Sequence, residues 1–399
     1  MHPEPLTVLA IATYRKGDEF LRECRRQGCR VLLLTEEKLR DADWPREAID
    51  GFFYLRREMS EAELRKGLAH AARTERIDRI VALDDFDVEL AAALREYLQL
   101  PGMGISTALA FRDKLAMRTR ARALGVPCPA FVHAVNRQAI DEWCRRALPP
   151  WVLKPRFQAA SVGIRKLNTA NDVPPALDAL GDEFGDFLLE QFIPGDVFHV
   201  DSIVSGAHPV LAVVSRYGAP PMSVVHDGGI FITRTLPEDD PAVPTLRELN
   251  GRILTGFGLQ RGASHTEFIR SGSGDWYFLE TSARVGGAFI VDMVDAATGV
   301  NLWREWARVE IAGEHGPYEP PAARTGHAGI ILSLARQEEP DTSAYDAPEI
   351  VTRLRKRHHA GLIVASPDPQ RVQQLLDDYV GRFYRDFHAS APAPDRPTE

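Results

Sequence analysis

The sequence predicts a multidomain chain of the α/β and α+β classes, and three observations support this prediction. Its 399 residues are enough for two or three hydrophobic cores. Strand-like and helix-like segments alternate through the first hundred residues, which is typical of a parallel sheet with helices on both faces. Later in the chain, apolar strand-like runs are joined by short turns, which is typical of antiparallel hairpins. We therefore expect a parallel-sheet domain first and hairpins after it.

The first domain, expected over residues 1–110, should be a Rossmann-like parallel sheet. Its elements alternate, with strands expected at 8–12, 31–34, 52–55 and 79–83 and helices at 17–28, 61–73 and 88–98. No glycine-rich fingerprint follows the first strand, so a dinucleotide site is not expected. Asp84 and Asp85 follow the last of these strands, where ligand sites cluster, but N-capping of the next helix by Asp85 is the favoured explanation.

The remaining residues are predicted to form further helices, strands and hairpins. The expected segments are a helix at 111–124, strands at 151–155, 164–167 and 187–193, a hairpin of 198–204 and 210–215 turning at Gly206, a helical stretch from Gly287 to about 311, strands at 327–334 and 361–366, and a helix at 371–387. The Pro-rich end, residues 389–399, is expected to be disordered.

Composition limits the classes of partner. The net charge is −8 and no dense basic stripe is present, which argues against nucleic acid as the main partner. The four cysteines show no metal-ligand spacing and suggest a reducing compartment. No signal peptide and no apolar segment near the roughly 20 residues of a membrane span is seen. We therefore expect a cytoplasmic protein without a membrane partner.

Two glutamates are the most informative feature of the chain. Glu267 and Glu280 each close an apolar strand-like run, and a turn-rich stretch at 271–275 separates the runs. Residues alternate faces along a strand, so an antiparallel hairpin can place both carboxylates side by side. Adjacent carboxylates repel unless a cation lies between them, and Mg²⁺ with nucleotide phosphates is the usual occupant. Arg284 would add a planar cation nearby, although a solvated surface hairpin with two glutamates is also common.

Lysines suggest where phosphates would bind. Only seven of the 48 basic residues are lysines, so we expect those that remain where a compact ammonium is required, and this points to Lys114 and Lys154. Lys154 lies on a strand that precedes the small-residue loop at 158–163, and such a loop can fold over anionic oxygens. An ordinary hairpin with an exposed lysine is the competing interpretation. The segment 190–195 could read an adenine edge through its backbone, or could simply be a strand end.

In their order, these segments resemble the ATP-grasp superfamily, particularly its carboxylate–amine (L-amino acid) ligases. The motifs that carry the resemblance are Arg112-Asp113-Lys114, Leu153-Lys154-Pro155, the segment 190–195 (EQFIPG), the segment 262–268 (GASHTEF) and the segment 280–287 (ETSARVGG). The resemblance implies a pre-ATP-grasp domain at 1–110 and an ATP-grasp domain at 111–315, with a lid lobe at about 125–190 and a Mg–ATP lobe at about 191–315. A small C-terminal α+β domain would occupy 316–388.

The resemblance also implies a role for each matching residue. The nucleotide would be bound by Lys114, Lys154, Ser161, Gly163, Glu190, Phe192, Ile193 and Asp196. The metal ligands would be Glu267, Glu280 and Ser282, and Arg284 with Lys154 would act on the transferring group. The candidates for substrate contact are His265, His226, Arg234, Gly286 and Gly287. For His265, a satisfied strand histidine is the favoured alternative. Ser282 replaces a common Asn, Asp196 lies one position before the usual ribose-binding acid, and the loop has one glycine where relatives often have several.

The implied activity is an ATP-dependent ligation of a small carboxylate to an amine through an acyl phosphate, with ADP and phosphate released. Its cofactors would be ATP and Mg²⁺, with Mn²⁺ as a substitute. The alternatives are a carboxylase that activates bicarbonate, as biotin carboxylases do, and a nucleotide-binding module without turnover. A homodimer through the N-terminal domain is expected by analogy.

Overall fold

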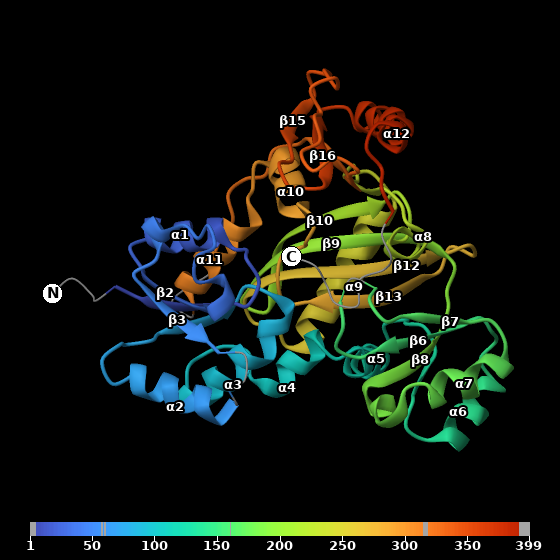
Figure 1. The fold of residues 1–399 in the computed structure, drawn as a ribbon, viewed down its shortest axis with the longest axis horizontal. Coiled ribbons are helices and arrows are strands. Elements are labelled where there is room, and N and C mark those ends of the chain that lie inside the picture. Colours follow the sequence, from blue (N-terminus) through green and yellow to red (C-terminus); the bar gives the residue numbers. More distant parts are fainter. Residues whose placement is uncertain (1–4, 57–58, 60, 160, 314–317, 391–399) are drawn as a thin grey trace.

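The computed structural model describes residues 5–56, 59, 61–159, 161–313 and 318–390, and it contains three sheets (Figure 1). The first sheet is parallel and has the order β3-β2-β1-β4. Its strands are β1 (Thr7–Ala12), β2 (Arg30–Glu36), β3 (Gly51–Leu55) and β4 (Arg79–Ala82), and the helices between and after them are α1 (Asp18–Arg26), α2 (Glu61–Ala71) and α3 (Val88–Leu98). The predicted parallel-sheet domain is confirmed.

A short helical segment connects this sheet to the second one. It comprises α4 (Ile105–Ala108) and α5 (Lys114–Ala123). The helix expected from residue 111 begins only at Lys114, because Leu109–Phe111 forms a separate 3-10 turn and the Asp113 side chain caps α5 by accepting from the Leu115 amide at 2.9 Å.

The second sheet has the order β5-β8-β6-β7 and is antiparallel. Its elements are β5 (Phe131–His133), α6 (Arg137–Cys144), β6 (Trp151–Pro155), β7 (Arg165–Leu167), α7 (Val173–Asp178) and β8 (Phe187–Gln191). Trp151 and Leu153 point into a small core beneath α6 and α7. The strands expected at 151–155 and 164–167 therefore form the predicted returning pair, with the loop 158–163 between them.

The third sheet has eight strands in the order β13-β12-β9-β10-β11-β14-β16-β15. These strands are β9 (Gly195–Ser205), β10 (His208–Tyr217), β11 (Phe231–Thr235), β12 (Gly262–Ser271), β13 (Trp276–Ser282), β14 (His327–Leu334), β15 (Ile350–Arg353) and β16 (His359–Ser366). Both predicted hairpins are present. β9 and β10 turn at Gly206 and Ala207, which both have positive φ as a two-residue hairpin turn requires.

Five helices accompany this sheet: α8 (Pro221–Asp227), α9 (Ala242–Phe257), α10 (Ile290–Thr298), α11 (Leu302–Ala312) and α12 (Pro369–Asp386). The single helical stretch expected from Gly287 to 311 is in fact two helices. The chain leaves α10 at Gly299 with a φ of 75°, and the Asn301 side chain then caps α11 by accepting from the Trp303 and Arg304 amides.

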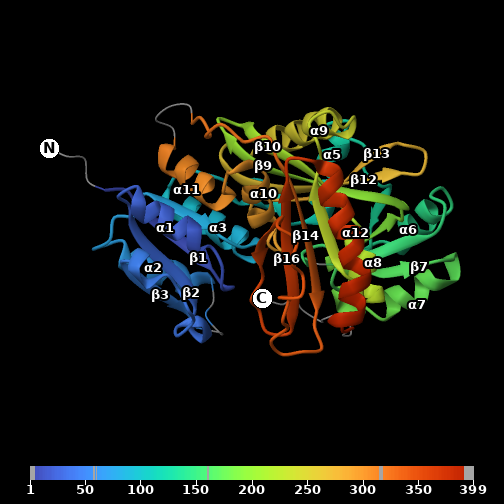
Figure 2. The same ribbon diagram turned by 90° about the horizontal axis from the view of Figure 1, so that it is seen from above.

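The segment assigned to a C-terminal α+β domain does not form a sheet of its own. β14 pairs with β11, so the strands of this segment extend the large sheet, and α12 lies along β14 and β16 (Figure 2). From residue 391 on, the tail expected to be disordered lies outside the described residues. Within the described part of the chain, no helix combines the length and apolar character needed to cross a membrane.

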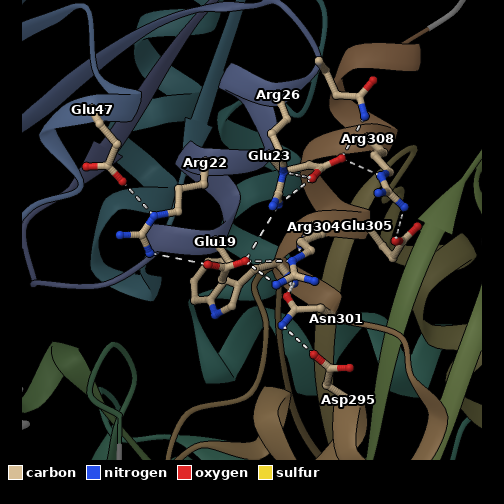
Figure 3. A network of polar contacts seen from close by, with 12 residues as sticks. Glu19, Arg22, Glu23, Arg26, Glu47, Asp295, Asn301, Arg304, Glu305 and Arg308 are labelled. Carbon is tan, nitrogen blue, oxygen red and sulfur yellow. Dashed lines mark hydrogen bonds and ion pairs between the residues drawn. The ribbon is translucent and has the colours of Figure 1, made fainter.

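The N-terminal domain is attached to the large sheet by packing and by charge. Phe20 of α1 packs edge-on against Trp306 of α11, with ring centroids 5.4 Å apart, and one hydrophobic core runs through both. Ion pairs also join α1 to α11, and Figure 3 shows their side chains. Arg304 pairs with Glu19 at 2.7 Å, and Arg308 pairs with Glu23 at 2.6 Å. The edge of the first sheet is therefore held in a defined position relative to the large sheet.

Candidate active site

A cleft of about 920 Å³, including its part open to solvent, lies where the second sheet meets β12 and β13. A volume of this size is at the upper end of small-molecule sites. Eight of the residues assigned to nucleotide or metal line the cleft: Lys114, Lys154, Ser161, Glu190, Phe192, Ile193, Glu267 and Glu280. Apolar side chains from both sides, including Val152, Ile164 and Leu279, complete the lining.

The two glutamates face each other across the β12–β13 hairpin. Glu267 and Glu280 are direct partners in the strand register, and a β-bulge follows Glu267. The Tyr217 hydroxyl donates to Glu267 at 2.8 Å, and Lys114 Nζ lies 3.2 Å from a Glu280 oxygen. Burial alone would raise the pKa of Glu280, but the charges of Lys114 and Lys154 lower it. Two adjacent carboxylates that open to a cleft are a donor set suited to a hard divalent cation.

Lys114 connects this pair to the loop over the cleft. Its ammonium donates to the Gln158 carbonyl at 2.6 Å as well as contacting Glu280. The preceding residue, Asp113, accepts from Arg156, which lies just before the loop. The first turn of α5 thereby holds one end of the loop 158–163, and it places a buried cation at the point where the loop and the hairpin approach each other.

Lys154 belongs to a buried cluster of three charges. It donates to one oxygen of Glu190 at 2.8 Å, and Arg118 donates to the other oxygen, also at 2.8 Å. Burial lowers the pKa of Lys154, although the Glu190 carboxylate opposes this effect. Sequence reasoning missed Arg118, but a signal was present: it lies four residues after Lys114, on the same face of α5.

His265 belongs to a buried network behind Glu267. Its Nδ1 lies 2.8 Å from one oxygen of Asp201, and His199 Nδ1 lies 2.6 Å from the other. On its far side, His265 Nε2 is 3.5 Å from Glu267. Burial would lower the pKa of His265, but Asp201 raises it to about 9. Tyr217, whose hydroxyl holds Glu267, lies at 3.4 Å from the same Nε2. His265 therefore acts as a partner of the metal-ligand candidate, in the manner of a satisfied strand histidine.

The network also explains a glycine and reveals a missed sequence signal. β9 carries His199 and Asp201 two residues apart, β12 carries His265 and Glu267, and the antiparallel register sets each histidine opposite an acid. This repeated His-x-acid pattern was readable in the sequence.

The three groups of His199, Asp201 and His265 lie close enough to share a metal, yet both ring Nδ1 atoms already bond to Asp201. A Cβ at Gly286 would lie 2.8 Å from Asp201 Oδ1, so this glycine allows a close approach to the network.

Arg284 lies beyond the hairpin and contacts the N-terminal domain. Its Nη2 and Nε donate to one Asp85 oxygen at 2.7 and 3.1 Å, and the Ser282 hydroxyl donates to the same oxygen at 3.1 Å. The N-capping role expected for Asp85 is wrong, because Asp84 accepts the Phe86 amide instead. Burial would raise the pKa of Asp85, but Arg284 and Arg112 lower it. Ser282, proposed as a metal ligand, directs its hydroxyl toward Asp85.

Several predicted site residues are not brought into the cleft. Val197 lines the cleft, so the side chain of its neighbour Asp196 lies on the other face of β9, where it pairs with Arg216 at 2.8 Å. The hydroxyl of Thr233 on β11 contacts His199. Arg234 is the next residue, so its side chain leaves the opposite face of the sheet, near α12. His226 is exposed at the end of α8 and lies 3.3 Å from the Ser161 carbonyl. Gly163 and Gly287 do not line the cleft. Gly163 adopts a positive φ and lies beside Pro155.

Comparisons with known proteins agree with this geometry. Residues 148–292 match the ATP-grasp domain family. The L-arginine-specific L-amino acid ligase of Bacillus subtilis is 24% identical over 241 residues, covering 59% of this chain and 58% of that protein. The D-alanine–D-alanine ligase B of Pseudomonas syringae pv. tomato is 26% identical over 220 residues, covering 52% and 67%. The chain thus spans little more than half the length of the first of these relatives.

A solved structure shows the same overall fold. The L-amino acid ligase from Bacillus licheniformis superposes with a TM-score of 0.76 at 17% identity, covering 96% of this chain and 98% of that one. At this level of identity the likeness concerns the fold. It extends over nearly the whole length of both chains.

Proposed function

We propose that this chain, an ATP-grasp protein similar to carboxylate–amine ligases, joins a small carboxylate to an amine with ATP and releases ADP and phosphate. One observation carries the proposal. Glu267 and Glu280 face each other at the wall of a cleft, with the buried ammonium groups of Lys114 and Lys154 beside them. This charge pattern suits a metal-bound polyphosphate better than it suits a neutral ligand.

The cleft offers matching surfaces for the parts of ATP. Phe192 and Ile193 follow β8 and provide apolar surface and backbone groups for the adenine ring, with Val152 and Leu279 facing them. Lys154 and Lys114 would neutralise the phosphates, and the backbone of the loop at 158–163 would close over them. The position on the cleft side of β9 where an acid would bind the ribose is occupied by Val197, so no acidic side chain lies there within the described residues.

Mg²⁺ would be held by Glu267 and Glu280, and it would neutralise the charge of the transferring phosphoryl group. The residues fit such an ion, because both carboxylates are directed to the cleft and are oriented from behind by Tyr217 and Lys114. Ser282 would be a weaker third ligand, since its hydroxyl bonds to Asp85.

The reaction would proceed in two transfers. A carboxylate is a poor electrophile, so one of its oxygens would first attack the γ-phosphorus of ATP, forming an acyl phosphate as the bond to ADP breaks. The amine nitrogen would then attack the acyl carbon, and the C–O bond to phosphate would break as the nitrogen loses its proton. The chain contributes mostly position and charge: lysines at the phosphates, Arg284 near the carbonyl oxygen, and the loop as a barrier to water.

Amino acids are the proposed substrates. Support comes from sequence similarity to an L-amino acid ligase and to D-alanine–D-alanine ligases, whose names specify amino acids as substrates. The site would act on small molecules, in a cytoplasmic protein, and the expected homodimer through the N-terminal domain stays a prediction.

A release assay tests the proposal. The protein with Mg²⁺ and ATP is incubated with a matrix of amino acids, alone and in pairs, and ADP, AMP and products are quantified by mass spectrometry. We expect ADP and phosphate, an amide product, and capture of the activated carboxylate by hydroxylamine as a hydroxamate. AMP with pyrophosphate would overturn the acyl-phosphate mechanism. ADP release that needs bicarbonate and no amine would indicate a carboxylase, and ATP binding without ADP formation would indicate a module without turnover.

A further inference from the structure

Asp85 and Arg284 make a contact between two domains that are far apart in the sequence. Asp85 lies at the carboxyl end of β4 in the parallel sheet, and Arg284 lies two residues after β13 in the large sheet. Only 4% of the surface of Asp85 is exposed, so its carboxylate is buried away from solvent. A pair this buried is costly to form unless its geometry is well satisfied, and the geometry of this pair is uneven.

The hydrogen bonds of Arg284 leave part of its guanidinium unused. A guanidinium carries five N–H groups. Two of them, on Nε and Nη2, donate to Asp85 Oδ2, and one on Nη1 donates to the Val285 carbonyl at 2.7 Å. The remaining two, one on Nη1 and one on Nη2, have no partner among the described residues. The side chain is thus fixed on two edges and keeps two N–H groups for another acceptor.

The carboxylate of Asp85 is used on one side only. Three donors, two from Arg284 and one from Ser282, converge on Oδ2, whereas the buried Oδ1 has no hydrogen-bond partner among the described residues. A pair that served stability alone would be expected to engage both oxygens in a two-point fork, since an unsatisfied buried oxygen is destabilising. The observed arrangement instead fixes the direction of the guanidinium.

We propose that Asp85 is a positioning residue for the ligation, holding Arg284 so that its two remaining N–H groups face the acyl oxygen of the substrate. The proposal rests on the proposed function, because it assigns Arg284 to the reacting carbonyl. It makes the N-terminal domain a contributor to the chemistry: a residue in the turn after β4 aligns a residue just after β13. The bidentate donation that lysine cannot provide depends on this alignment.

The test uses the isosteric variant Asp85→Asn in the full-length protein. An amide oxygen accepts more weakly from Arg284 and carries no charge, so we expect kcat for ADP release to fall at least tenfold while the KM for ATP changes less than twofold. The control is Glu19→Gln, which removes another carboxylate between the same two domains, paired with Arg304 at 2.7 Å. The control should keep the wild-type kcat. Asp85→Glu, which keeps the charge but changes its reach, should recover part of kcat and serves as the test if Asp85→Asn does not fold.

A double-mutant comparison separates positioning from a structural role. If Asp85 acts through Arg284, the variant combining Asp85→Asn with Arg284→Lys should be no slower than Arg284→Lys alone, within about twofold. Multiplicative losses, or a wild-type kcat in the soluble Asp85→Asn variant, would overturn the proposal. A wild-type protein that releases no ADP with any substrate pair would overturn the proposed function, and this inference with it; an active wild type with an unaffected Asp85→Asn variant overturns the inference alone.

Discussion

At the scale of single residues, each cation assigned to the reaction is paired with a carboxylate of the chain. Lys154 lies against Glu190, Lys114 against Glu280 and Arg284 against Asp85. Buried charges without partners are strongly destabilising, so these pairs allow the two lysines to be buried at the cleft. In the proposed reaction, phosphate oxygens would compete with Glu190 and Glu280 for the N–H groups of the lysines, and Glu280 would turn from Lys114 toward a metal ion. Arg284 would keep its contact with Asp85 and use its two remaining N–H groups.

The metal pair gives the prediction at this scale. Glu267→Gln or Glu280→Gln should each lower turnover on the order of 10²-fold or more, because each removes a charged ligand of the ion that neutralises the transferring group. ADP release at saturating Mg²⁺ measures the effect. Asp275→Asn, in the exposed turn of the same hairpin, is the matched control and should keep full turnover. Near-normal turnover in both glutamate variants would place the metal site elsewhere.

At the scale of elements, the ends of strands determine which side chains meet. β4 ends at Ala82, and the turn after it presents three aspartates with three different partners. Asp84 caps the turn and pairs with Lys16, Asp85 pairs with Arg284, and Asp87 accepts from the amide and the hydroxyl of Thr13. This edge of the parallel sheet is where ligands bind in related α/β architectures. Here it supplies a residue to the neighbouring domain.

Asp87 gives a pH-dependent prediction at this scale. Burial raises the pKa of Asp87 to about 7, although the Thr13 hydrogen bonds oppose the shift. An unfolded aspartate titrates near 3.9, so between about pH 4 and 7 the folded state holds a proton that the unfolded state has lost. The free energy of unfolding should therefore decrease as pH rises through this window, by about 1 kcal/mol per pH unit from this group.

Urea unfolding of the wild type and of Asp87→Asn at pH 5.5, 6.5 and 7.5 checks this expectation. The amide does not titrate, so the difference in unfolding free energy between the two proteins should shift in favour of the variant as pH rises. Parallel pH curves for the two proteins would show that Asp87 stays ionised in the folded state.

At the scale of the whole molecule, the large sheet and the N-terminal domain act as one support for the site. The core between them is continuous, from Val8 in β1 through Trp306 in α11 to Ile330 in β14. Around it, the α1–α11 ion pairs join the domains (Figure 3). The contact between Asp85 and Arg284 lies on another part of the same interface. The alignment proposed for Arg284 requires that the two domains do not move independently, and the continuous hydrophobic core holds them together.

The buried carboxylate of Glu23 at this interface leads to a prediction about stability. Glu23 is 1% exposed and accepts from Arg308, Arg26 and Gln27. Glu23→Gln removes the charge of a buried carboxylate that accepts from two partly exposed arginines, and should lower the free energy of unfolding on the order of 2 kcal/mol. Glu47→Gln, which affects the exposed pair with Arg22 in the same network, should cause a clearly smaller loss, because solvent screens exposed ion pairs. Chemical denaturation measures both, and equal losses for the two variants would contradict the importance of the buried interdomain pair.

The sequence by itself determined the features that depend on neighbours close along the chain. The strand–helix alternation of the first domain follows from short hydrophobic periods. Glu267 and Glu280 face each other because a hairpin with a short turn leaves few possible registers. Lys154, its loop and the returning strand are likewise local. The resemblance to ATP-grasp ligases rested on these local motifs, and the matches to that family agree with it.

The tertiary structure alone decided which distant groups became partners. Asp85 and Arg284 are 199 residues apart, Arg118 and Glu190 are 72 apart, and Asp201 and His265 are 64 apart. The pairing of β14 with β11, which carries the C-terminal strands into the large sheet, is of the same kind. Hydrophobic period and turn chemistry specify which face a side chain occupies within its own element. They do not specify which other element packs against that face, because this choice depends on the shape and charge of whole surfaces that meet only once the chain has folded.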